Sequence, residues 1–293
     1  MKIVAVCVLA LLAACATSNR SANVNRDSEL TSAIESLTAH FEGDVGIYVR
    51  RLTDGRTFAW RADEVFPTAS MIKVPILIGV FGALERHEFE YRKPMKWDVS
   101  RKYDDHDVTA RFEDGVDVEP AELVTFMCTF SDNTASLWLQ ELAGGGVKIN
   151  VWLSSHGFEH TRVNSRTDGR ETARKEFGWG QTTPREMAEL LVAIRERRVV
   201  NPTASEEMER ALSRSHWTEE ALAPIPPQVH AMSKQGAVNR SRSEVLLVDA
   251  PHGAYVLCII TKNQKDESFE HENAGFQLLR DVSRAVYEQF ERG

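Results

Sequence analysis

The two ends of the chain carry strand patterns, whereas the part between them carries helical patterns. Near the N-terminus, residues 45–52 and 57–61 are predicted strands, joined as a hairpin by the turn residues 53–55. In the C-terminal third, strand-like runs return at residues 231–235, 244–248 and 255–261. We therefore expect an α+β fold, in which an antiparallel sheet formed from the N- and C-terminal segments is flanked by helices and carries a mostly helical insertion.

A long apolar segment at residues 71–84 predicts the central helix of the insertion. It is apolar nearly all round, which is typical of a helix buried on every side. Other helical patterns cover residues 120–142, 184–197, 204–213 and 273–290, and Leu30, Ile34, Leu37 and Phe41 mark the apolar face of an N-terminal helix. These patterns predict an α/β part at about residues 27–64 and 218–293 and a helical part at about residues 65–217.

The first 26 residues have the character of a targeting segment. A lysine at position 2 precedes an apolar run that is too short to span a bilayer and that ends in small residues, which predicts a signal peptide over residues 1–14. The ending Leu12, Ala13, Ala14, Cys15 resembles the bacterial lipobox, so we expect Cys15 to be lipidated and residues 15–26 to form a flexible tether. A plain signal peptide that contains Cys15 is the alternative. The protein is expected on the periplasmic side of a bacterial membrane, inner or outer.

The charge balance excludes some partners and the cysteine count leaves one question open. With 43 Asp and Glu against 35 Lys and Arg, the chain is acidic and a poor binder of nucleic acid. The charged run at residues 104–107 is interpreted as a solvated loop, because four adjacent residues cannot all face one metal ion. No nucleotide-binding glycine loop occurs, so we predict no metal and no cofactor. Cys128 and Cys258 are interpreted as small core residues, with pairing left open. We expect a monomer.

A serine and a lysine stand one helical turn apart at the start of the buried helix. Ser70 and Lys73 lie on one face of this helix. Backbone N–H groups at a helix N-terminus can stabilise an oxyanion, and a lysine in apolar surroundings loses its proton readily enough to act as a base. A helix cap and a solvated charge are the ordinary interpretations of such residues, but the apolar run that follows Lys73 disfavours solvation.

Two further polar triplets follow in the chain. Ser131, Asp132 and Asn133 form a corner between two helical patterns. Lys234, Gln235 and Gly236 precede a strand pair, and a glycine at that point lets a substrate backbone approach closely.

Taken in this order, the three motifs resemble the SxxK, SDN and KTG motifs of the serine β-lactamases and penicillin-binding proteins, and are most similar to class A β-lactamases. The resemblance extends over about residues 28–291 and implies a β-lactamase-like fold. It implies that Ser70 is the acylated nucleophile, that Lys73 accepts or relays its proton, and that Ser131 passes a proton to the leaving nitrogen.

The resemblance also implies the groups that bind the substrate. Asn133 would hold a side-chain amide, and Lys234, Gln235 and Gly236 would line the substrate strand. Lys234 would place a positive charge near a substrate carboxylate, with Arg242 as a second cation. The backbone N–H groups of Ser70 and Ala237 would form the oxyanion hole.

The chain departs from this pattern where class A enzymes carry the glutamate that activates the deacylating water. A gap-free alignment from Pro184 places Thr167 at that position and Glu171 where the family has asparagine. We interpret Glu171 as a substitute general base, with an ordinary loop charge as the alternative. Gln235 replaces the usual hydroxyl residue of the third motif.

These features predict a serine hydrolase that opens β-lactam rings through an acyl-enzyme on Ser70. One alternative is a D-alanyl peptidase or an esterase-like relative. Another is a penicillin-binding lipoprotein with slow or no deacylation, and a third is a lipid-anchored wall-binding module whose catalytic residues no longer turn over.

Overall fold

The computed structural model describes residues 28–291. The predicted signal peptide, the lipidation site Cys15 and the tether lie outside the described residues, and they stay predictions, as does the monomeric state. Within residues 28–291, no helix is both long enough and apolar enough to cross a membrane.

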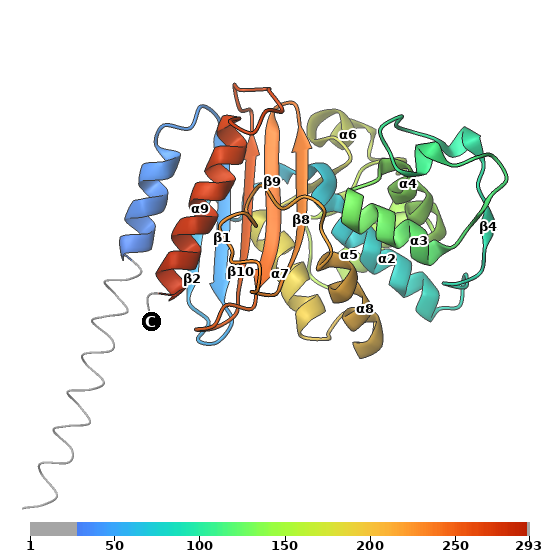
Figure 1. Ribbon diagram of the computed structural model, residues 1–293, viewed down its shortest axis with the longest axis horizontal. Coiled ribbons are helices and arrows are strands. Elements are labelled where there is room, and N and C mark those ends of the chain that lie inside the picture. The colour runs from blue at the N-terminus through green and yellow to red at the C-terminus, as the bar shows by residue number, and fades with distance from the viewer. Residues whose placement is uncertain (1–27, 292–293) are drawn as a thin grey trace, which may run out of the picture.

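A five-stranded antiparallel sheet forms the centre of the molecule (Figure 1). Its strand order is β2-β1-β10-β9-β8, so strands from the beginning and the end of the chain are neighbours. The strands are β1 (Asp44–Arg51), β2 (Thr57–Trp60), β8 (Ala231–Val238), β9 (Ser241–Val248) and β10 (Tyr255–Lys262). The predicted α+β architecture is confirmed.

Alternate residues of each strand pack on opposite faces of the sheet. In β1, Ile47 and Val49 join one apolar cluster with the helix at residues 28–38 and with α9 (Ala274–Glu291). Tyr48, between them, joins the second and larger cluster, which includes α2 (Lys73–Glu85) and α7 (Pro184–Arg195). The two-residue period of a strand therefore separates two cores, one on each side of the sheet.

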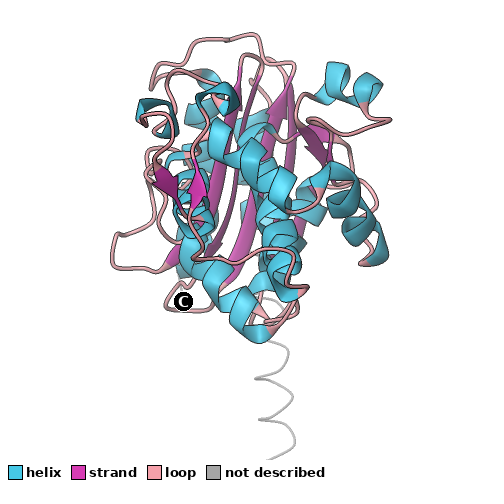
Figure 2. Cartoon of the chain, turned by 90° about the vertical axis from the view of Figure 1, so that its right-hand side faces the viewer, coloured by secondary structure: helices cyan, strands magenta, loops and turns pink. Residues whose placement is uncertain are grey.

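Most of the helical part lies beyond β8 at the edge of the sheet, whereas α7 packs on one face of it (Figure 1); from the side, the helices and short strands beyond β8 stand in front of the sheet (Figure 2). The remaining helices are η1 (Ala69–Ile72), η2 (Val99–Arg101), η3 (Thr109–Arg111), α3 (Pro120–Thr125), the π-helix η4 (Phe126–Phe130), α4 (Asn133–Leu142), α5 (Gly145–Ser155), α6 (Glu171–Phe177) and α8 (Pro202–Leu212). Short strand pairings join β3 (Phe66–Pro67), β7 (Gly180–Thr182) and β6 (Arg162–Val163), and also β4 (Met95–Lys96) and β5 (Asp117–Val118).

The helical patterns of the sequence leave residues 143–183 without a predicted helix, and for residues 145–155 this is wrong, because α5 lies there. Three glycines at residues 144–146 give the segment the character of a loop, but Gly144 has a positive φ of 87° and sits at the N-cap of a regular helix. Only Gly146, Ile149 and Leu153 are buried in this helix, so its apolar face is too narrow to stand out in the sequence.

The two cysteines of the described part, Cys128 and Cys258, are free and buried. Burial raises the pKa of the Cys128 thiol to about 12, so it stays protonated and packs as a small apolar group. Their interpretation as core residues is confirmed.

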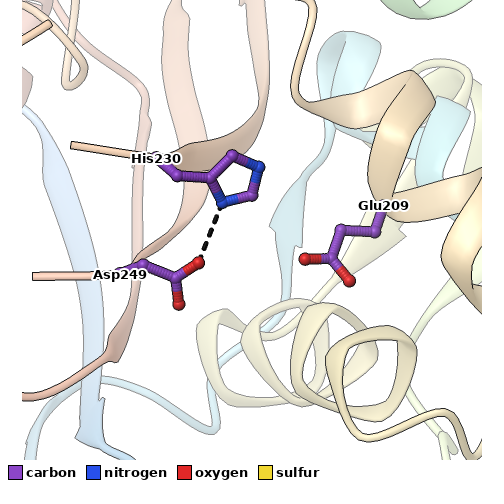
Figure 3. Close-up of side chains that lie close together, drawn as sticks. All are labelled: Glu209, His230 and Asp249. Carbon is purple, nitrogen blue, oxygen red and sulfur yellow. Dashed lines mark hydrogen bonds and ion pairs between the residues drawn. The ribbon is translucent and has the colours of Figure 1, made fainter. Parts of the chain in front are cut away.

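A network of charged side chains ties α7 and α8 to one end of the sheet. Glu209, His230 and Asp249 lie close together in the way that metal ligands do (Figure 3). Both carboxylate oxygens of Glu209 are occupied, however, because Arg195 donates to one at 2.5 Å and Arg197 donates to the other. Arg195 also donates to Asp249 at 2.6 Å, and the second oxygen of Asp249 bonds to His230 at 2.9 Å. The arginines supply the positive charge that these carboxylates require.

Substitution Glu209→Gln should lower the free energy of unfolding by about 2 kcal/mol, because two partly solvated guanidinium groups lose a charged partner. For a domain of this size, the melting temperature should fall by roughly 5 °C. Thermal unfolding followed by circular dichroism measures this change. Glu207→Gln, on the exposed side of the same helix, is the matched control and should change stability by less than about 0.5 kcal/mol. Equal melting temperatures for the two variants would contradict the role of the network.

Candidate active site

Ser70 lies in a strained turn at the start of the central helical run. It is the second residue of η1, which leads directly into α2. Ala69 before it has a φ of +43°, a left-handed conformation that costs a non-glycine residue about 1 kcal/mol or more. The turn places Ser70 among the free N–H groups at the beginning of a helix, where a negative charge is favoured.

The edge strand β8 passes very close to this turn at Gly236. A Cβ atom on Gly236 would lie 2.7 Å from the backbone nitrogen of Ser70 and 2.8 Å from the carbonyl oxygen of Thr68. Only glycine allows this approach. From β9, the hydroxyl of Ser243 donates to the Thr68 carbonyl at 3.3 Å. Two strands of the sheet therefore fix the position of the Ser70 turn.

Lys73 is the first residue of α2 and is completely buried. Its Nζ lies 3.1 Å from Ser70 Oγ, 3.0 Å from Ser131 Oγ and 2.8 Å from Asn133 Oδ1, and it also contacts the Ser131 carbonyl. All four contacts are to uncharged oxygens. Burial therefore lowers the pKa of Lys73 well below its usual value, and the positive charge of Lys234 lowers it further.

Ser131 places its hydroxyl between the two buried lysines. It ends the π-helix η4 in a left-handed conformation, with φ 62° and ψ 29°. Its Oγ lies 3.0 Å from Lys73 Nζ and 3.1 Å from the Nζ of Lys234, on β8. Burial lowers the pKa of Lys234 to about 8. The hydroxyl group thus lies between two buried amines, both with lowered pKa values.

Two buried carboxylates hold the polar corner in place. Asp132 caps α4 by accepting from the Ala135 N–H at 2.7 Å, and it also accepts from the Thr109 N–H at 2.9 Å. Asp107 accepts from the Asn133 N–H at 2.8 Å. The interpretation of residues 104–107 as a solvated loop is therefore wrong for Asp107, which is only 7% exposed and positions the second motif.

Ser70 lies where two clefts meet. The first, of about 670 Å³, is named here the Trp179-side cleft, and its lining includes Ser70, Asn133, Glu176, Trp179 and Ala237. The second, of about 580 Å³, is named the Ser131-side cleft, and its lining includes Ser70, Ser131, Asn133, Gln235 and Ala237. The structure thus brings together all of the predicted site residues except Glu171 and Arg242.

Arg242 does not line either cleft, in contrast to its predicted place as a second cation at the site. It is completely buried, and its guanidinium group donates to the carbonyls of Val238, Ser241 and Ser268. The guanidinium also stacks on the rings of Phe269 and Phe276, with its central carbon 4.4 and 4.7 Å from the ring centroids. As the cross-strand partner of Ala237, it supports the end of β8 from behind.

Glu171 also lies apart from the two clefts. It begins α6 with an exposed side chain whose carboxylate accepts from the Gly169 N–H at 3.2 Å. Thr167, aligned with the family's glutamate, is buried and donates to the Ser165 carbonyl at 2.8 Å. A different carboxylate of the same helix, Glu176, lines the Trp179-side cleft.

Sequence reasoning missed several residues that shape the site. Phe130, Trp217 and Glu220 line the Ser131-side cleft, but they belong to loops and helix ends without a recognisable motif. The aspartate run at residues 104–107 is the sequence signal that could have identified Asp107. A buried aspartate commonly accepts hydrogen bonds from the backbone N–H groups at the start of a helix, as Asp107 does at α4.

Comparison with known proteins agrees with this geometry. The model of the β-lactamase enzyme family matches residues 29–290. A β-lactamase from Sphaerobacter thermophilus is similar in structure, with a TM-score of 0.80, 24% identity, and coverage of 91% of this chain and 98% of that chain. An acyl-enzyme complex of a PBP-A mutant with penicillin G has a TM-score of 0.80 at 23% identity, over 91% of this chain and 97% of that chain.

A β-lactamase from Xanthomonas campestris is similar at 20% identity, with a TM-score of 0.80 and coverage of 90% of this chain and 98% of that chain. At these identities the solved structures establish the shared fold, while the family model, which extends over nearly all the described residues, establishes the family. The chain belongs to the β-lactamase enzyme family.

Proposed function

We propose that the protein is a serine hydrolase that opens β-lactam rings by forming an acyl-enzyme on Ser70. The observation that carries the proposal is the position of Lys73. Its buried amine lies within hydrogen-bond distance of both Ser70 Oγ and Ser131 Oγ. A neutral amine held there can take the proton of the nucleophile and return one by way of Ser131.

In the proposed reaction, Ser70 Oγ attacks the carbonyl carbon of the ring and its proton passes to Lys73 Nζ. The negative charge on the carbonyl oxygen is stabilised by the backbone N–H groups of Ser70 and Ala237. When the C–N bond breaks, Ser131 gives its proton to the ring nitrogen and is reprotonated by Lys73. Water must then attack the ester on Ser70 to release the opened product.

Two features support a β-lactam as the substrate. The chain belongs to the β-lactamase enzyme family, and the similar PBP-A mutant was captured as an acyl-enzyme complex with penicillin G. The Asn133 amide lines both clefts beside Ser70, where it can hold an amide of the substrate.

Slow release of the acyl-enzyme is a second candidate property, favoured by one observation. The carboxylate of Glu171 is bound to the Gly169 N–H, and Glu171 lines neither cleft. For Glu171 to act as the proposed general base, its side chain must leave this position. Under this candidate the protein is acylated efficiently and behaves as a penicillin-binding protein.

Substitution Ser70→Ala should abolish covalent labelling by a penicillin, because no acyl-enzyme can form. Intact-mass spectrometry after incubation with penicillin G measures the adduct. Ser155→Ala, an exposed serine on α5, is the control and should be labelled like the wild type. If the Ser70→Ala variant gained the same penicillin mass as the wild type, Ser70 would be disproved as the nucleophile.

The acylation rate should fall as the pH rises through about 8, because Lys234 loses its proton there and the site loses a positive charge. The alkaline limb of kcat/KM for a chromogenic cephalosporin measures this effect. Lys234→Arg, which keeps its charge, should lack the limb. Glu244 also has a pKa of about 8, so Glu244→Gln is the control and should retain the limb. An alkaline limb that persists in Lys234→Arg would contradict the assignment.

Hydrolysis of the acyl-enzyme should limit turnover, so a burst of product equal to the enzyme concentration should precede a slow steady state. If Glu171 is the general base, Glu171→Gln should lengthen the lifetime of the adduct by roughly 100-fold or more. Glu176→Gln, in the same helix, removes the carboxylate that lines the Trp179-side cleft. Comparing the two variants shows which of the two carboxylates acts as the base. An unchanged adduct lifetime in Glu171→Gln would remove Glu171 from the mechanism.

A further inference from the structure

The charged side chains that line the Ser131-side cleft are mainly acidic. Its lining holds four carboxylate side chains, Asp104, Asp107, Glu219 and Glu220, whereas Arg280 is its only Lys or Arg side chain. The guanidinium of Arg280 donates to the carbonyls of Glu219 and His271 and to the side-chain oxygen of Gln277. Since these protein oxygens already occupy Arg280, the described lining offers no free Lys or Arg side chain to a substrate, and the nearest buried cation is Lys234, 3.1 Å behind the Ser131 hydroxyl.

Glu220 is the carboxylate of this cleft that has a buried oxygen without a hydrogen-bond partner among the described residues. Asp104 and Asp107 accept hydrogen bonds from Asn133, whereas Oε2 of Glu220 is buried and finds no hydrogen-bond partner among the described residues. A buried carboxylate oxygen without a donor is costly, so a hydrogen-bond donor or a cation that reaches this oxygen from the cleft would be favoured.

Glu244 stands directly behind Glu220. It is the cross-strand partner of Gln235, so both side chains lie on the same face of the sheet, and Gln235 lines the cleft. The completely buried carboxyl of Glu244 accepts from the Ala221 N–H at 2.7 Å, next to Glu220 in the chain. Its Oε1 has no hydrogen-bond partner of normal geometry among the described residues. The nearby Ser233 hydroxyl lowers the pKa of Glu244, but burial has the larger and opposite effect.

The charge of Glu220 disfavours ionisation of Glu244. Burial, and then the charge of Glu220, raise the pKa of Glu244 to about 8, and burial also raises the pKa of Glu220. With a pKa of about 8, Glu244 is mostly protonated at neutral pH, so it adds no full negative charge behind Glu220. A bound cation would relieve this arrangement, whereas a bound carboxylate would worsen it.

Aromatic rings stand on another side of the same cleft. Phe130 and Trp217 line it and are 37% and 42% exposed. The indole N–H of Trp217 donates to the Phe130 carbonyl at 3.1 Å, which holds the ring in place. Aromatic rings and a carboxylate that line one cleft are the combination that recognises organic cations.

We propose that the Ser131-side cleft binds a positively charged group of the substrate, an ammonium or guanidinium, with Glu220 as its counter-ion and Phe130 and Trp217 as its aromatic walls. This inference rests on the proposed function, since Ser131 there protonates the leaving nitrogen and its cleft receives the leaving side of the substrate. The preferred substrate therefore carries an additional cationic group on its leaving side.

Competition with small probes tests binding without relying on the choice of substrate. Benzyltrimethylammonium should slow acylation by a chromogenic cephalosporin, and benzoate at the same concentration should leave the rate within twofold. In Glu220→Gln the inhibition constant of benzyltrimethylammonium should rise about tenfold. Glu270→Gln removes an equal charge from a neighbouring exposed position outside the cleft lining, and should leave this inhibition constant unchanged.

A matched pair of cephalosporins tests the substrate preference. With the same acyl group, the one that carries a quaternary ammonium on the leaving side should have at least a tenfold higher kcat/KM than the one that carries an added carboxylate, and Glu220→Gln should reduce the ratio. Equal inhibition by the two probes, or a ratio that Glu220→Gln leaves unchanged, would overturn the cation subsite. Acylation that persists in Ser70→Ala would instead disprove the proposed function, so the two failures are distinguishable.

Discussion

The structure depends on the burial of the Lys73 amine beside two hydroxyl groups. An ammonium ion in this place would require a carboxylate partner, but the side-chain groups that contact Nζ are the Ser70 and Ser131 hydroxyls and the Asn133 amide oxygen. The neutral amine is therefore favoured, and a neutral amine is also what a general base needs to be. The apolar helix α2 supplies the burial, while Asp107 and Asp132 hold the neighbouring corner by backbone hydrogen bonds and do not contact the amine.

Much of the fold could be predicted because its periodicities are strong. The two-residue alternation of β1 and the all-round apolar character of α2 each have one simple structural solution. The three motifs identified most of the active site, because the first opens the helical run η1–α2, the second lies at the break between η4 and α4, and the third lies in the edge strand β8 beside them. Helix α5 was missed because three glycines conceal a narrow apolar face.

The remaining features depend on tertiary register, which a single sequence does not display. Arg242 and Glu244 are two residues apart on β9 and lie on one face, yet the first is enclosed by carbonyls and rings and the second lies behind the cleft. Glu220 meets Glu244 only because the segment before β8 folds across the sheet. In the same way, the rotation of α6 about its axis decides which glutamate faces the nucleophile. Glu176 lies in the lining of the cleft that includes Ser70, whereas Glu171 lies outside it.

The pairing of β1 with β10 has a consequence for the order in which the molecule can assemble. Asp44 pairs with Lys262, so the central strand pair closes only after nearly the whole domain has been synthesised. Contacts this distant in sequence make folding slow, and they postpone it until the chain is almost complete. The turn that carries Ser70 is fixed by β8 and β9. It therefore reaches its native conformation last, although its own residues are synthesised early. A growing chain would thus have no functional nucleophile until its final strands are in place.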